Sequence, residues 1–249
     1  MQFNYIIVAA IVSLLVIVFL FKGIKKIAAW ALLVFLALAL FGTVFGFNLF
    51  TDITDIVQNF PTAKKLFLLK DEQILAGFES SLTDTTAIDA AGVASFQSSL
   101  NKNDLDSIRG NYYKLIIIDT KTFADLDSIT SELSTKPFSG DDLLDAIRAD
   151  NTLEQLTGII IKTQNMPDTP QVRGYVADNL KKSKISTNAD ARATLFAQLV
   201  QASTKDQSLL IKSLKSDAVI IYPETITFKL AKVLPSFITE KIVGAIGGT

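Results

Sequence analysis

The run YYKLIIID, residues 112–119, decides the fold. Its centre, residues 115–118, is a leucine followed by three isoleucines, without the polar alternation of a half-exposed strand. An uninterrupted run of this kind predicts a strand that is buried on both faces. Such a strand belongs to a sheet with helices on both sides, which is the α/β class.

Further strands are predicted on both sides of this run. Before it, the apolar segments 66–69 and 74–78 flank the polar turn KDEQ and predict a β-hairpin. After it, the apolar runs at 158–161 and 218–222 predict two more strands. We therefore expect residues 62–249 to form one α/β domain, with a mixed sheet of about five strands and helices on both faces.

Helices are expected between and after these strands, because capping residues precede several apolar-periodic segments. Thr122 is followed by Asp125 and Ser139 by Asp142, Thr169 precedes Pro170, and Asn188 can cap the next segment. The predicted helices span residues 90–100, 104–108, 122–133, 139–147, 170–182, 188–200, 207–214, 223–234 and 237–246.

Residues 1–50 have a different character. Two apolar segments, 5–21 and 27–50, are joined by Lys22-Gly23-Ile24-Lys25-Lys26 and contain no acidic residue. A helix needs about 20 apolar residues to cross a bilayer, so the pattern predicts a transmembrane helical hairpin. One alternative is a cleaved secretory signal, but a signal carries its positive charge before the apolar run, where residues 1–4 have none. The other alternative is one spanning helix and one helix in the membrane interface.

The lysines predict how this hairpin is oriented. Lys22, Lys25 and Lys26 all lie in the loop, and basic loops stay in the cytoplasm. We therefore expect loop 22–26 to be cytoplasmic, with the N-terminus and the C-terminal domain outside. Gly42 and Gly46 form a small-residue face that predicts close contact with the lipid-embedded helix of a membrane protein or of a second copy. Residues 51–61 are predicted to be an amphipathic linker helix that ends at Pro61.

Composition excludes several kinds of chemistry. The chain has no histidine and no cysteine, which removes the most common general base, the usual zinc ligands, thiolate chemistry and disulfides. Three of its 24 basic residues and none of its 25 acidic residues lie in the first 50, so the remainder carries a net charge of about −4. That balance argues against a nucleic-acid surface. Without sequons or cysteines, the composition favours a prokaryotic source, and no cofactor is indicated.

Two groups of acidic residues occupy positions at which proteins can hold metal ions. Asp119 ends a buried strand, as the Mg²⁺-holding aspartate of phosphate-handling proteins does, but the chain has no glycine-rich phosphate loop. We expect it to cap the next helix. Asp141, Asp142 and Asp145 lie at a predicted helix start, where carboxylates offset the helix dipole, and the spacing of a calcium loop is missing. No metal site is predicted.

A candidate ligand site follows if the three strands at 112–119, 158–161 and 218–222 are parallel. Their carboxyl ends would then line one edge of the sheet, where open α/β sheets bind ligands. The residues gathered there would be mostly uncharged and polar, which suits binding rather than proton transfer. They are Asp119, Thr120, Thr163, Gln164, Asn165, Tyr222 and Glu224.

These observations favour a membrane-anchored, non-enzymatic interaction or assembly module with an extracytoplasmic domain. The competing class is an extracytoplasmic hydrolase or small-ligand-binding enzyme that uses Ser/Lys or carboxylate residues, since a buried lysine can replace histidine as a base.

Overall fold

The computed structural model describes residues 51–52, 54–55, 58–59, 62–81, 85–204 and 207–235. The chain divides into two compact units, Met1–Asp52 and Ile53–Thr249, and the fold below is that of the second. The predicted transmembrane hairpin, including Gly42 and Gly46, lies outside the described residues. Those residues of the predicted linker that are described between 51 and 59 are helical. Within the described ranges, no helix combines the length and the hydrophobicity that crossing a bilayer requires.

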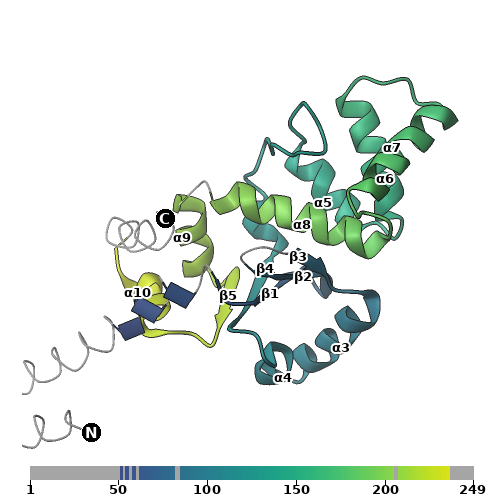
Figure 1. The fold of residues 1–249 in the computed structure, drawn as a ribbon. Helices are drawn as coiled ribbons and strands as arrows, with labels where there is room; N and C mark the ends of the chain where they lie inside the picture. Colours follow the sequence, from purple (N-terminus) through teal and green to yellow (C-terminus); the bar gives the residue numbers. More distant parts are fainter. Residues whose placement is uncertain are drawn as a thin grey trace, which may run out of the picture. The chain divides into compact units, whose positions relative to one another are not determined.

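The second unit is built on a mixed five-stranded sheet with the order β3-β2-β1-β4-β5 (Figure 1). The central strand β1 is antiparallel to β2 and parallel to β4, whereas β4 is antiparallel to β5. The strands are β1 Lys65–Lys70, β2 Ile74–Ser80, β3 Thr85–Ala87, β4 Lys114–Asp119 and β5 Val219–Tyr222. The β-hairpin predicted for residues 66–78 and the buried strand predicted for residues 112–119 are confirmed. The α/β class with a mixed sheet is also confirmed.

Helices cover both faces of this sheet (Figure 1). On one face α3, Ala90–Asn101, contacts β2, and α4, Leu105–Arg109, contacts β4. On the other face lies a group of four helices, of which α8 contacts β2 and β3. The group comprises α5 Gly140–Arg148, α6 Thr152–Thr163, α7 Pro170–Lys182 and α8 Asn188–Thr204. Two further helices, α9 Gln207–Lys215 and α10 Ile226–Val233, stand before and after β5 in the chain.

The apolar run at 158–161 is helical, so its prediction as a strand is wrong. It lies in α6, which packs against α5, α7 and α8. Ile159, Ile160 and Ile161 are all buried because this helix has neighbours on several sides. Asn188, expected to cap the helix that follows it, is the first residue of α8 and caps α6 instead: its Oδ1 accepts a hydrogen bond from the Leu153 N–H at 2.9 Å.

The helix predicted for 122–133 is also wrong. The chain forms only a short 3₁₀ turn, η1, Thr120–Phe123, and then an isolated β-bridge between Ile129 and Phe138. Phe123, Ile129 and Phe138 are each at most 1% exposed. A residue inside a continuous helix could not exchange the two backbone hydrogen bonds that join Ile129 and Phe138, so tertiary burial overrides the local capping signal here.

The direction of β5 follows from the turn before it. Asp217 takes a left-handed backbone conformation with φ 55°, and the next carbonyl, that of Ala218, accepts a hydrogen bond from the Asp119 N–H at 2.7 Å. The chain therefore enters β5 beside the last residue of β4 and runs back along it. Three parallel strands, the premise of the predicted ligand site, do not exist in this sheet.

One glycine gives a sharp test of how the helical group packs. A Cβ built on Gly140, the first residue of α5, would lie 2.0 Å from the Leu126 carbonyl oxygen, whereas a Cβ on Gly174 in α7 meets nothing within 4 Å. We expect Gly140→Ala to lower the free energy of unfolding by about 1–3 kcal/mol, the usual effect of overpacking. The matched Gly174→Ala should raise it by roughly 0.5–1 kcal/mol, because alanine favours a helix over glycine. Chemical denaturation of both variants measures this, and two equal changes would contradict the packing of α5 on residue 126.

Candidate functional site

The structure separates the seven residues predicted to share one edge. Asp119 ends β4 and Thr120 follows it, but Tyr222 pairs with Leu115 near the opposite end of that strand. Thr163, Gln164 and Asn165 lie at the end of α6, because their segment is helical. Glu224 follows β5 and forms an ion pair with Lys232 at 2.9 Å. The grouping at a single edge is therefore wrong, since β5 is antiparallel and the segment before Gln164 is not a strand.

Several of these side chains have clear structural roles. Asp119 Oδ1 accepts a hydrogen bond from the Lys121 N–H at 2.9 Å, which confirms its prediction as a cap. Gln164 Nε2 approaches the Leu133 carbonyl oxygen at 3.5 Å. A hydrogen bond to Asp106 of α4 raises the pKa of Tyr222. Through these contacts, the three side chains stabilise the helices and turns around them.

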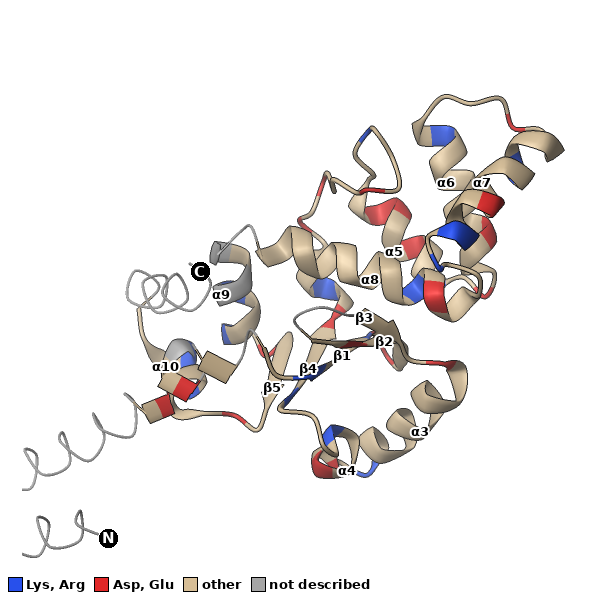
Figure 2. Ribbon diagram, in the orientation of Figure 1, with Lys and Arg blue, Asp and Glu red and all other residues tan. Residues whose placement is uncertain are grey.

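Two of the acidic residues of α5, Asp142 and Asp145, form long ion pairs with basic side chains. Asp142 lies 3.5 Å from the Lys162 Nζ, and Asp145 lies 3.5 Å from Arg148. Figure 2 shows basic and acidic positions interspersed over α5 to α8. In the part of the chain that the structure describes, no group of three or more acidic side chains has the geometry of a metal site.

Two buried lysines lie side by side at the amino ends of β1 and β4. Lys65 and Lys114 are register partners and are 6% and 2% exposed. The Lys65 Nζ donates to the Ala63 carbonyl oxygen at 3.1 Å, and the Lys114 Nζ donates to that of Pro223 at 2.7 Å. Burial lowers the pKa of Lys65, as expected for an ammonium removed from water. These ammonium groups bond to the main chain where it enters β1 and leaves β5, which indicates a structural junction.

The same junction holds the described end of the linker. The Tyr113 hydroxyl donates to Asp55 Oδ2 at 2.6 Å, and Asn59 Nδ2 donates to Asp55 Oδ1 at 2.6 Å. The bond from Tyr113, followed by that from Asn59, lowers the pKa of Asp55. The charged form of Asp55 therefore connects the helical residues before the domain to Tyr113, just before β4.

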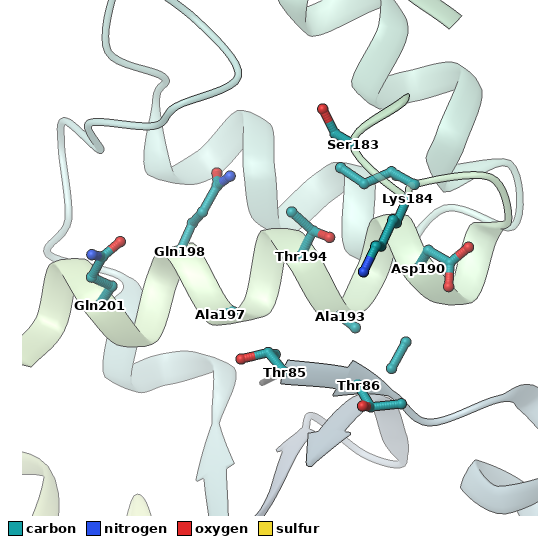
Figure 3. A pocket seen from close by; sticks show the side chains of 12 residues that line it. Thr85, Thr86, Ser183, Lys184, Asp190, Ala193, Thr194, Ala197, Gln198 and Gln201 are labelled. Atoms are coloured by element: carbon teal, nitrogen blue, oxygen red, sulfur yellow. The ribbon is translucent and has the colours of Figure 1, made fainter. Parts of the chain in front are cut away.

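A groove of about 650 Å³ runs between β3 and α8, and it is the candidate binding site in this part of the fold (Figure 3). In Figure 3, Ala193 and Ala197 of α8 lie on the side of the helix that faces β3, whereas the Gln198 amide points away from β3. The uncharged polar lining of the groove is supplied by hydroxyl and amide groups, those of Thr85, Thr86, Ser183, Thr194, Gln198 and Gln201. Gln198 Oε1 is buried and has no hydrogen-bond partner among the described residues. A buried amide oxygen without a donor is rare in folded proteins, but this atom has almost no accessible surface and is therefore not open to a ligand in the groove.

The charged groups of this groove do not form an acid–base pair. The Asp190 carboxylate accepts hydrogen bonds from the Ser186 N–H at 3.1 Å and the Thr187 N–H at 2.9 Å. Burial alone would raise the pKa of Asp190, but these bonds outweigh it and lower the pKa. Lys184 stands in the loop after α7 with a left-handed backbone, φ 64°. The groove therefore offers hydrogen bonds to uncharged polar groups such as the peptide unit.

The α8 residues of this groove were not among the predicted site residues. Thr194, Gln198 and Gln201 recur at spacings of four and three, so they share one helix face. That polar face could have been found in the sequence, but its position beside β3 could not. Searches of the chain against protein-family models, curated proteins and solved structures find no match.

Proposed function

We propose that the chain is a membrane-tethered, non-enzymatic interaction module, whose domain binds an extended polypeptide segment at the β3 edge of its sheet. Residues 1–50 would form the anchor, with loop 22–26 in the cytoplasm and the domain outside. The observation that carries the proposal is the groove between β3 and α8, whose lining combines hydroxyl and amide groups with the apolar side chains of Ala87, Ile185, Ala193 and Ala197.

The side chains that line the groove favour the binding of a protein segment over catalysis. Hydroxyl and amide side chains can donate to and accept from main-chain groups, and an edge strand is where an extended segment commonly adds to a sheet. The two buried lysines lie elsewhere, at the sheet end opposite Asp119, and bond to main-chain carbonyls. They support the architecture of the domain rather than the enzymatic alternative.

The experiment uses single cysteines, which are unique reporters because the natural chain has none. In intact cells, an impermeant maleimide should label a cysteine at Tyr175, whose side chain is 64% exposed, but not one at Gly23. A cysteine at Gln201, an exposed residue of the groove, should be labelled in the purified chain yet protected in native membranes. Tyr175→Cys serves as its control and should be labelled in both.

Each arm of this experiment can fail separately. Labelling of Gly23→Cys but not of Tyr175→Cys would overturn the orientation. Equal labelling of Gln201→Cys in membranes and in the purified chain would mean that the groove is empty, which would overturn the interaction role.

A further inference from the structure

The outer edge of β3 has a defined hydrogen-bonding pattern. In the ladder between β2 and β3, Ala87 is the partner of Phe78. One residue further on, the Ile88 N–H donates to the Gly77 carbonyl oxygen at 2.9 Å. Residue pairs along an antiparallel ladder alternate between hydrogen-bonded and non-hydrogen-bonded. Because Ile88 bonds to β2, the main-chain N–H and C=O of Ala87 point away from β2, and neither bonds to another described residue.

This edge is open where the groove lies. β3 is the last strand of the sheet, and within the described ranges no strand pairs with its outer side. Thr85 and Thr86 are exposed, Ala87 is half-buried, and all three line the groove. An exposed edge strand is a template on which another strand can add. An extended segment that lies in the groove can therefore exchange hydrogen bonds with Ala87. An antiparallel segment does so with a single residue, which donates to the Ala87 carbonyl and accepts from its N–H.

The face of the sheet that bears Ala87 determines which ligand side chain lies under α8. Ala87 packs against the same core cluster as Phe78, whose ring meets that of Phe196 in α8. A ligand residue paired with Ala87 has its side chain on this same face. There it meets Ala193 and Ala197, the two α8 residues that face β3 in Figure 3. Two alanines leave room for an apolar side chain of about the size of valine.

A lysine cluster, formed by Lys181, Lys182 and Lys184, stands at the end of α7 and in the loop after it. The Lys184 side chain lines the groove and extends toward β3 (Figure 3). In the part of the chain that the structure describes, none of the three lysines forms an ion pair. The nearest acidic residues along the chain are Asp178 and Asp190, so three positive and two negative charges leave about +1. The Asp190 carboxylate is also engaged by main-chain N–H groups. Charge complementarity therefore favours acidic residues in the part of a ligand that meets this cluster.

We propose that the groove binds an extended acidic segment of a partner protein, which adds as an antiparallel strand to β3. One apolar side chain of the segment lies beneath Ala193 and Ala197, and its acidic residues face the lysine cluster. This assignment rests on the proposed interaction function and gives its ligand a chemical class, an acidic strand with one apolar anchor.

The test measures peptide binding to the full-length chain in detergent by fluorescence anisotropy. The probe is a fluorescein-labelled, amidated peptide of sequence EETVTEE, and the matched probe QQTVTQQ lacks its charges. We expect EETVTEE to bind about tenfold more tightly at low salt, and the difference to shrink at high salt because exposed charges are screened. A third probe is EETVTEE with a methylated valine nitrogen, which cannot donate to the Ala87 carbonyl. Its affinity should be about tenfold lower than that of EETVTEE.

Two protein variants separate the contributions of charge and strand pairing. Replacement of all three lysines of the cluster by glutamine should abolish the preference for EETVTEE over QQTVTQQ. Ala87→Pro removes an N–H that points away from β2, so it should weaken both peptides about tenfold while circular dichroism shows that the fold is retained. Lys212→Gln is the control, because Lys212 is exposed and pairs with Asp125 outside the groove, and both affinities should stay unchanged.

Three outcomes with the natural chain would overturn the assignment, whether or not Ala87→Pro folds. They are equal affinities for EETVTEE and QQTVTQQ, no loss of affinity on methylation of the valine nitrogen, and no binding of either peptide at about 1 mM, roughly the weakest affinity of a specific complex. Light scattering of the same sample tests a second copy as the occupant, and a dimer that Ala87→Pro abolishes would also overturn the assignment. In each case, protection of Gln201→Cys in native membranes would still support the broader interaction function.

Discussion

Phe196→Ala is expected to lower the free energy of unfolding of the domain by about 3–5 kcal/mol, the range found when a large core aromatic is removed. Phe196 lies in the middle of α8 and is fully buried. Its ring meets Phe78 of β2 edge-on, with centroids 5.1 Å apart, and Phe123 of η1 at 6.3 Å. This one side chain therefore joins the helical group to the sheet and to the turn after β4.

The matched control is Tyr175→Ala on α7, because Tyr175 is also aromatic but 64% exposed, and its loss should change stability by less than about 0.5 kcal/mol. Urea denaturation of the full-length chain, followed by far-ultraviolet circular dichroism, measures both. Phe196→Leu, which keeps most of the apolar volume, should fall between the natural protein and the alanine variant. A loss below 1 kcal/mol for Phe196→Ala would contradict the close packing of α8 on β2.

The sequence predicts the sheet well where local patterns and burial agree. The run at 115–118 is buried on both faces, because Leu115 and Ile117 pack in the cluster under α3 and α4, and Ile116 and Ile118 pack in the cluster under the four-helix group. The hairpin of β1 and β2 is equally clear, because a polar turn separates two apolar segments. The run at 158–161 carries the same signal as β4 but forms a helix. A short isoleucine-rich segment cannot be assigned from periodicity when the helix that contains it is surrounded by other helices.

The candidate site depends on the features that the sequence predicts least well. The expected ligand edge required β5 to be parallel, but the direction of β5 is set by a turn at Asp217 and by its contact with the end of β4. Neither has a local signature that distinguishes the two directions. The groove arises because β3 is only three residues long and α8 packs against it.

The junction of Lys65 and Lys114 shows how a buried charge can be tolerated without catalysis. Lys114 is 2% exposed, donates to the Pro223 carbonyl and lies 5.3 Å from the centre of the Tyr113 ring. Its hydrocarbon stem fills space on the β4 face that also bears Ile116 and Ile118, and its ammonium holds the chain after β5. Two separate contributions are therefore expected, one from packing and one from the hydrogen bond.

Lys114→Ala should remove both contributions and destabilise the domain by about 3 kcal/mol, because it leaves a cavity and removes the donor to the Pro223 carbonyl. Lys114→Met keeps the volume of the stem and loses only the ammonium, so about 1–2 kcal/mol is expected. Lys212→Ala is the control, since the side chain of Lys212 is 74% exposed and its pairing with Asp125 should contribute less than about 1 kcal/mol. Thermal and urea unfolding of the three variants would measure the order Ala, then Met, then the control. If Lys114→Met were as stable as the natural chain or more so, the cost of burying the ammonium would equal or exceed the value of its bond, and the bond to Pro223 would not stabilise the domain.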